Sequence, residues 1–301
     1  MACRSTTASL FAPQADFNDP IQGAIPNCAF IAALSSLAWI YWPKIMNTLS
    51  PTFYNLNANG DASGTLPVLA VEKQFDINAQ SSDAGIWPAV YEKAYIKDLR
   101  NGINGDAYYC DVSKSEFSLL WPQKTGGLVA LTGWTKAHYN PSSNNPGQYI
   151  YTSLSDAGSR PRPKFPMVAW TKTALNWPDT FNSSQPVSDT NRCPGYDQML
   201  PDHCYSILGT IYQNPLYYIV LRNPRGIKET YQGQPYSGTG HLLPETTVMY
   251  AGGTMYAYNR GAAGSSRAVG QIRLDMNTYP GLFAIRADQF QRYFLGYGRV
   301  Y

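Results

Sequence analysis

Three residues that lie far apart in the chain have the side chains needed for thiol-based acyl transfer. Cys28 stands at the start of a predicted helix, where free N–H groups and the helix dipole favour the nucleophilic thiolate. His203 could take the thiol proton, and Asn223 could hold the imidazole in orientation. Each residue also has an ordinary interpretation: a small buried side chain for Cys28, a hydrogen-bonded polar residue for His203, and a turn residue before a proline for Asn223.

A predicted β-hairpin brings His203 and Asn223 together. Two runs rich in β-branched and aromatic residues, 204–212 and 216–222, flank a short turn that contains a proline. Antiparallel pairing about residue 213 places 203 opposite 223, within a residue or two of register error. We therefore expect both side chains at the open end of one hairpin.

The nucleophile is expected at the first turn of a long helix. Asn27 is a suitable N-cap, and apolar residues follow it with helical spacing. A second helix is predicted to begin near Pro88, and 140–166 is interpreted as loop and linker. Further along, short β-type runs alternate with turns. The pattern predicts an α+β fold with a helical lobe over 1–118 and a β-rich lobe over 119–301.

Composition argues against several functional classes. Charged residues make up 14% of the chain and the net charge is +3, which leaves no electrostatic footprint for nucleic acid. The longest apolar stretch, 28–42, is interrupted by serines and is expected to be too short to span a membrane. No secretory signal is visible, and the five cysteines form neither a disulfide framework nor a zinc pattern, so we expect a cytoplasmic protein. Cys204 is expected to point to the strand face opposite His203.

Seven short segments follow one another in an order that is typical of one enzyme family. They are 19–28 (DPIQGAIPNC), 31–37 (IAALSSL), 86–95 (IWPAVYEKAY), 125–127 (TGG), 203–206 (HCYS), 222–226 (RNPRG), and 283–294 with its three phenylalanines. They are similar to landmarks of the calpain cysteine proteases, such as D-x-x-Q-G-x-x-G-D-C and H-A-Y-S. The chain therefore resembles the calpain family over most of its length.

The resemblance implies a papain-like, two-lobed fold with a helical N-terminal lobe, an antiparallel β C-terminal lobe and an active site in the cleft. It implies that Cys28 is the nucleophile, His203 the general acid/base and Asn223 the orienting amide of a catalytic triad. Gln22 would donate to the oxyanion, although a turn-stabilising amide is its ordinary interpretation. The implied activity is hydrolysis of a peptide or small amide through an acyl-enzyme on Cys28.

The matched segments differ from the family where a peptide substrate would dock. Asp202 and Arg225 replace a glycine and a tryptophan, and 112–114 lacks the pair of glycines expected after the second helix. Those glycines let a substrate backbone approach closely. Two alternatives to hydrolysis follow. One is an amide-forming or cyclising acyltransferase acting on a small molecule or short peptide; the other is a non-catalytic binding or scaffold protein on the same fold.

Calcium is the one cofactor that the resemblance raises. Asp19 and Glu92 match acidic positions that help ligate calcium in the first lobe of calpains. The acidic pair of the closing segment is replaced by Pro280 and Leu282, and a hard cation needs several oxygen ligands. We therefore expect no calcium requirement and no other cofactor, with Asp19 and Glu92 as weak candidate ligands.

Overall fold

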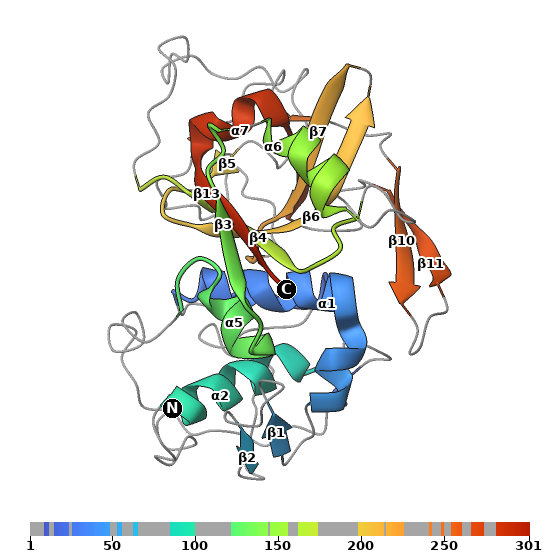
Figure 1. Cartoon of the computed structure of the whole chain (residues 1–301). Helices are drawn as coiled ribbons and strands as arrows, with labels where there is room; N and C mark the ends of the chain where they lie inside the picture. Colours follow the sequence, from blue (N-terminus) through green and yellow to red (C-terminus); the bar gives the residue numbers. More distant parts are fainter. Residues whose placement is uncertain are drawn as a thin grey trace, which may run out of the picture.

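The fold is that of a computed structural model, and it combines helices with one large sheet (Figure 1). The residues that the structure describes are 9–11, 15–23, 26–48, 53–55, 63–65, 85–99, 122–143, 145–155, 162–173, 198–213, 215–225, 241–242, 248–249, 254–260, 266–273 and 281–301. Within them the helices are α1 (Cys28–Thr48), α2 (Trp87–Leu99), α5 (Gly126–Thr132), α6 (Pro146–Tyr149), the π-helix η1 (Ile150–Leu154) and α7 (Ala287–Tyr293).

The central element is an antiparallel sheet of seven strands in the order β3-β13-β4-β6-β7-β12-β9. Its strands are β3 (Lys136–Tyr139), β4 (Met167–Thr171), β6 (Cys204–Gln213), β7 (Leu216–Arg222), β9 (Val248–Met249), β12 (Leu282–Arg286) and β13 (Phe294–Val300). Three two-stranded pairs are separate from it: β1 (Phe53–Asn55) with β2 (Ser63–Thr65), β5 (Gln198–Met199) with β8 (His241–Leu242), and β10 (Thr254–Arg260) with β11 (Ser266–Arg273). The predicted α+β class is confirmed.

Hydrophobic clusters pack on both faces of the sheet. Strand β4 is buried on both faces, so Val168 and Trp170 join the core formed with α1, α2 and α5, whereas Met167 and Ala169 join the core formed with η1 and α7. This division follows from the two-residue period of a strand. Figure 1 shows the first three helices on one side of the sheet, with α6 and α7 on the other.

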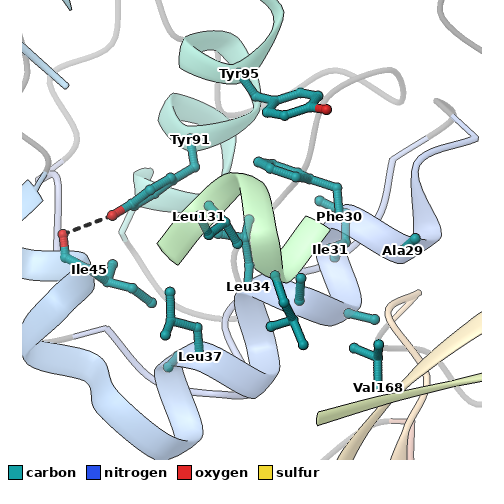
Figure 2. Close-up of a cluster of buried hydrophobic side chains, with 14 of the residues drawn as sticks. Ala29, Phe30, Ile31, Leu34, Leu37, Ile45, Tyr91, Tyr95, Leu131 and Val168 are labelled. Carbon is teal, nitrogen blue, oxygen red and sulfur yellow. Dashed lines mark hydrogen bonds between the residues drawn. The ribbon is translucent and has the colours of Figure 1, made fainter. Parts of the chain in front are cut away.

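Helix α1 is the centre of the helical core. Its apolar side chains pack with those of α2 and α5, and Tyr91 Oη donates a 3.2 Å hydrogen bond to the Ile45 carbonyl (Figure 2). Gly127 lets α5 lie directly on the first turns of α1, because a Cβ there would lie 2.8 Å from the Ala29 carbonyl oxygen and 3.0 Å from the Ala33 Cβ. α5 follows residue 118 in sequence, yet it packs with the helices that precede that residue.

Helix α1 continues to Thr48 and is therefore longer than the apolar stretch that the sequence analysis considered. In the part of the chain that the structure describes, it is the one helix long and apolar enough to cross a membrane by length and composition, and 72% of its most apolar window is buried inside the protein. A core helix of a soluble domain passes the same test.

The segment 140–166, which we expected to be loop and linker, contains α6 and η1, so that expectation is wrong in part. Asn145 caps α6 by accepting a 3.1 Å hydrogen bond from the Gln148 backbone N–H, and Pro146 follows at a favoured first position. Arg162 is buried against the kink in α1 that precedes Pro43. A proline cannot donate to the preceding turn, and Arg162 Nη2 donates instead to the carbonyls of Trp39 (2.8 Å) and Ile40 (2.5 Å).

The predicted hairpin is β6 and β7, and its register differs by two residues from the prediction. Ser206 pairs with Arg222, so the same register continued would place residue 205 opposite 223. The pairing also shifts at a bulge between Ile207 and Gly209. His203 consequently lies just outside the ladder, in the turn that leads into β6, rather than within a strand pair.

Candidate active site

Cys28 is the first residue of α1, as predicted, but the helix is not capped as expected. The backbone carbonyl of Asn27 accepts hydrogen bonds from the N–H groups of Phe30 (2.9 Å) and Ile31 (3.1 Å). The side-chain amide of Asn27 does not cap the helix; it donates to the buried carboxylate of Glu92 on α2. The expectation of a side-chain N-cap was wrong, because the hydrogen bond from Asn27 Nδ2 to Glu92 sets the orientation of the side chain, and Oδ1 accepts no hydrogen bond from the helix. The start of α1 is thus fastened to α2.

His203 is held by the end of the neighbouring strand β4. Its backbone N–H donates to Thr171 Oγ1 at 2.9 Å, and its carbonyl accepts from the Thr171 N–H at 2.9 Å. Asp202 precedes it with a positive φ of 49°, which marks the tight turn into β6. The ring of Tyr205 packs edge-on against the imidazole at 5.0 Å. These contacts leave His203 buried and fixed at the end of the sheet.

The hydrogen bond between His203 and Asn223 fixes the tautomer of the imidazole. His203 Nε2 lies 3.0 Å from Asn223 Oδ1, and the Arg225 backbone N–H lies 3.0 Å from the same atom. A backbone N–H can only donate, so the atom it meets is the amide oxygen and His203 Nε2 must carry the hydrogen. Nδ1 is then the nitrogen that remains free to accept a proton from a thiol.

The structure brings Cys28 against His203. The pKa of the Cys28 thiol is held well below its ordinary value, first by a hydrogen bond from Cys204 and then by the charge and hydrogen bond of His203, which together outweigh burial. The side chain of Cys28 remains partly exposed, so a reagent can reach it. The predicted trio of Cys28, His203 and Asn223 therefore meets at one place, with the polarity needed for a thiolate nucleophile.

Cys204 lies closer to the nucleophile than the sequence-based expectation allowed. We expected it on the strand face opposite His203 and gave it no part in the site. It belongs to the core that α1 forms, and its thiol interacts with that of Cys28, the first residue of α1. The hydrogen bond and burial raise the pKa of Cys204, so in this pair Cys28 carries the charge and Cys204 the proton.

Gln22 lies beside the same loop as Asn223. Its backbone N–H donates to the carbonyl of Pro224 at 2.8 Å, and its residue is half-buried. The chain segment that carries the predicted oxyanion donor is thereby attached to the residue that follows Asn223. The cleft positions 112–114, by contrast, lie outside the described residues.

Arg222 is a residue whose importance the sequence analysis missed. Its guanidinium is fully buried and donates to the Asn18 carbonyl (2.7 Å), to Asn18 Oδ1 (3.3 Å) and to Ser35 Oγ on α1 (2.7 Å). Burial lowers its pKa to about 10, against the opposing carboxylates of Asp16 and Asp19, so it stays charged at neutral pH. Arg222, the last residue of β7, thus connects the strand that precedes Asn223 to both α1 and the segment that contains Gln22. Its place beside Asn223-Pro224 was the available signal.

The two candidate calcium ligands have other hydrogen-bond partners. Asp19 Oδ2 accepts from the Asp16 backbone N–H (2.8 Å) and from Trp87 Nε1 (2.9 Å), and Glu92 accepts from Asn27. Over the residues that the structure describes, no three His, Cys, Asp or Glu side chains gather in a way that could hold a metal ion. Both carboxylates attach α2 to the segment around Cys28.

The site has the parts of a thiol acyl-transfer centre, and comparison with known proteins indicates the same class. No family model matches the chain. A thiol protease of Porphyromonas gingivalis (strain ATCC BAA-308 / W83) is 23% identical to it over 231 residues. The alignment covers 69% of this chain and 44% of the relative, so the chain corresponds to less than half of that protein. The similarity suggests a cysteine protease family and supports a thiol-dependent hydrolase.

Proposed function

We propose that this chain is a calpain-type cysteine peptidase that hydrolyses peptides or small amides through an acyl-enzyme on Cys28. The observation that carries the proposal is the ordered series Asn223–His203–Cys28, in which the Arg225 N–H sets the amide and the amide sets the imidazole tautomer. A histidine that only stabilised the fold would not need a fixed tautomer beside a partly exposed thiol whose pKa is lowered, whereas a histidine that activates Cys28 would.

In the proposed reaction, His203 Nδ1 takes the proton of Cys28, and the thiolate attacks the carbonyl carbon of the substrate. The oxyanion that forms accepts hydrogen bonds from the Gln22 side chain and the Cys28 backbone N–H. The imidazolium then gives its proton to the leaving amine as the C–N bond breaks, which leaves a thioester. Water, activated by the same imidazole, attacks the thioester and releases the acid.

The proposal includes a papain-like arrangement of two lobes, 1–118 and 119–301, with the substrate between them. The separate cores on the two faces of the sheet support it, and α5 would then cross from the second lobe onto the first. We further propose that the enzyme works in the cytoplasm without a cofactor, on a peptide or small amide, and that it binds neither nucleic acid nor membrane.

A second candidate keeps the acyl-enzyme but passes the acyl group to an amine. The specific observation in its favour is Arg225, whose backbone orients Asn223 in place of the tryptophan of the resembled motif. An arginine two residues after Asn223 would suit a carboxylate-bearing or short substrate better than an extended apolar peptide. Under this alternative, the proposed second step uses an amine in place of water.

The test is incubation with a library of fluorogenic peptide amides, followed by intact mass of the protein. We expect release of the fluorophore and an adduct on Cys28, both lost in Cys28→Ala and in His203→Ala. His138→Ala is the matched control, because His138 is an exposed histidine that the proposed mechanism does not use. Added hydroxylamine should leave hydrolysis dominant in a peptidase, and it should divert the product in an acyltransferase. A freely alkylated Cys28 that never accepts an acyl group would instead support the scaffold alternative.

A further inference from the structure

Helix α1 packs against strand β6, and each element begins with a cysteine, Cys28 and Cys204. Ser206 Oγ donates a 2.7 Å hydrogen bond to the Ala32 carbonyl. Cys28 lies four residues before Ala32, which is about 6 Å along a helix, and Cys204 lies two residues before Ser206, which is about 6.6 Å along a strand. Counting back from the contact between Ser206 and Ala32 therefore predicts that Cys204 lies beside Cys28. Cys28 packs against the hydrophobic cluster that contains Cys204, and each thiol shifts the pKa of the other, which agrees with this alignment.

The pair combines a partly exposed cysteine with a buried one. Cys28 is partly exposed at the start of α1, whereas Cys204 is 4% exposed and belongs to the helical core. These two are the free cysteines among the residues that the structure describes. A reactive, accessible thiol next to a second, protected thiol is the arrangement found where oxidation ends in a disulfide rather than in an over-oxidised acid.

We propose that Cys204 is a resolving cysteine, so that hydrogen peroxide or another hydroperoxide converts Cys28 and Cys204 into a reversible disulfide that blocks the nucleophile. The proposed loss of activity rests on the proposed function; the disulfide itself does not. The lowered pKa of Cys28 supports the first step, because the thiolate is the form that reacts with peroxide.

The chemistry balances in two steps. The Cys28 thiolate attacks one peroxide oxygen; an S–O bond forms, the O–O bond breaks, and the hydroxide that leaves takes up a proton to become water. The Cys204 sulfur then attacks the sulfenic sulfur of Cys28; an S–S bond forms, the S–O bond breaks, and the Cys204 proton leaves in a second water. The two thiols lose two electrons in total, and the peroxide gains them. A dithiol reductant restores both cysteines.

The positions of both residues in their elements make the bond accessible. Cys28 is the first residue of α1, and Cys204 is the first residue of β6, directly after the turn at Asp202 and His203. Residues at the ends of elements can shift further than residues inside a ladder. Because the two thiols lie close enough to interact, we expect only a small approach to the S–S distance of about 2.05 Å.

The experiment is brief exposure of the full chain to a few-fold molar excess of hydrogen peroxide, at least the two equivalents that a sulfinic acid requires, followed by intact mass and by peptide mapping without reduction. Cleavage with trypsin and Asp-N separates Cys204 from Cys193, which a tryptic peptide alone would keep together. Wild-type protein, Cys204→Ala and Cys193→Ala are compared, and the last is the matched control. Because the readout is mass, it does not depend on peptidase activity.

We expect the wild-type protein and Cys193→Ala to lose about 2 Da, to yield a linked peptide pair containing Cys28 and Cys204, and to regain alkylation of Cys28 after a dithiol. Cys204→Ala should instead gain about 32 Da on Cys28 and resist the dithiol. Equal over-oxidation of Cys28 in the wild type and in Cys204→Ala would overturn the proposal, as would a disulfide to any other cysteine. Disulfide formation without any amidase activity would refute the proposed function and leave the redox pair intact.

Discussion

The role of Asn223 can be measured without knowing the substrate, because Cys28 reports on it directly. Asn223→Ala removes the acceptor that lies 3.0 Å from His203 Nε2, and His203 is only 7% exposed, so water replaces the acceptor poorly. Leaving a buried donor without its partner costs about 1–3 kcal/mol. The same free energy destabilises the orientation of the imidazole that activates the thiol. The rate of Cys28 alkylation should therefore fall by about 5- to 150-fold.

The assay is alkylation of native protein by iodoacetamide at pH 6.5, about two units below an unperturbed thiol pKa, followed by peptide mapping. Arg225→Ala is the matched control, because the group that orients Asn223 is the Arg225 backbone N–H, which that substitution keeps. We expect Arg225→Ala to alkylate at close to the wild-type rate. A folded Asn223→Ala protein whose Cys28 reacts as fast as in the wild type would refute the inference that Asn223 activates the thiol through His203.

Four further outcomes test other parts of the structure. Because the pKa of Cys28 is lowered, its alkylation should stay fast as the pH falls below 8 and should decline only at more acid pH, whereas the thiols of denatured protein slow first. Gln22→Ala should lower kcat by about 10²–10³ with little change in KM, and it should leave alkylation of Cys28 intact. Gly127→Ala should lower the free energy of unfolding by about 1–3 kcal/mol in urea, because its Cβ would lie 2.8 Å from the Ala29 carbonyl oxygen. Arg222→Met, which removes three hydrogen bonds but little volume, should lower the free energy of unfolding by a similar 1–3 kcal/mol, about as expected for leaving buried acceptors unsatisfied; Arg222→Lys should recover part of the loss.

The sequence predicted best what depends on neighbouring residues. The start of α1 at Cys28 and the β6–β7 hairpin were both predictable, because a helix period and a pair of β-type runs around a proline turn are local patterns. The exact register was not predictable: the bulge between Ile207 and Gly209 shifts it, and nothing in the alternation of residues shows where a bulge falls. The prediction that His203 and Asn223 lie together was still correct despite the error in register, because both side chains lie beyond the paired residues of the hairpin.

Contacts between distant segments could not be read from the chain. Arg162 lies in a proline-rich stretch that has the composition of a linker, yet it supplies the donors that the kink in α1 needs. The amide of Asn27 was expected to cap α1, and a carboxylate 65 residues further along took it instead. The proximity of Cys204 to Cys28 could not be predicted for the same reason: it depends on how α1 lies on β6, which no local pattern indicates.

The two serines of α1 explain how a nucleophile on a helix is kept in place against a base on a sheet. Ser35 and Ser36 interrupt the apolar stretch, and in sequence they counted only as interruptions. In the fold, Ser35 Oγ accepts from Arg222 on β7, and Ser36 Oγ accepts from the Met167 backbone N–H on β4, each at 2.7 Å. Ser206 Oγ on β6 donates a hydrogen bond of the same length to the Ala32 carbonyl of α1. Hydrogen bonds have a direction and a length that apolar packing lacks, so these contacts fix where α1 sits along the sheet, and with it the distance from the Cys28 thiol to the imidazole.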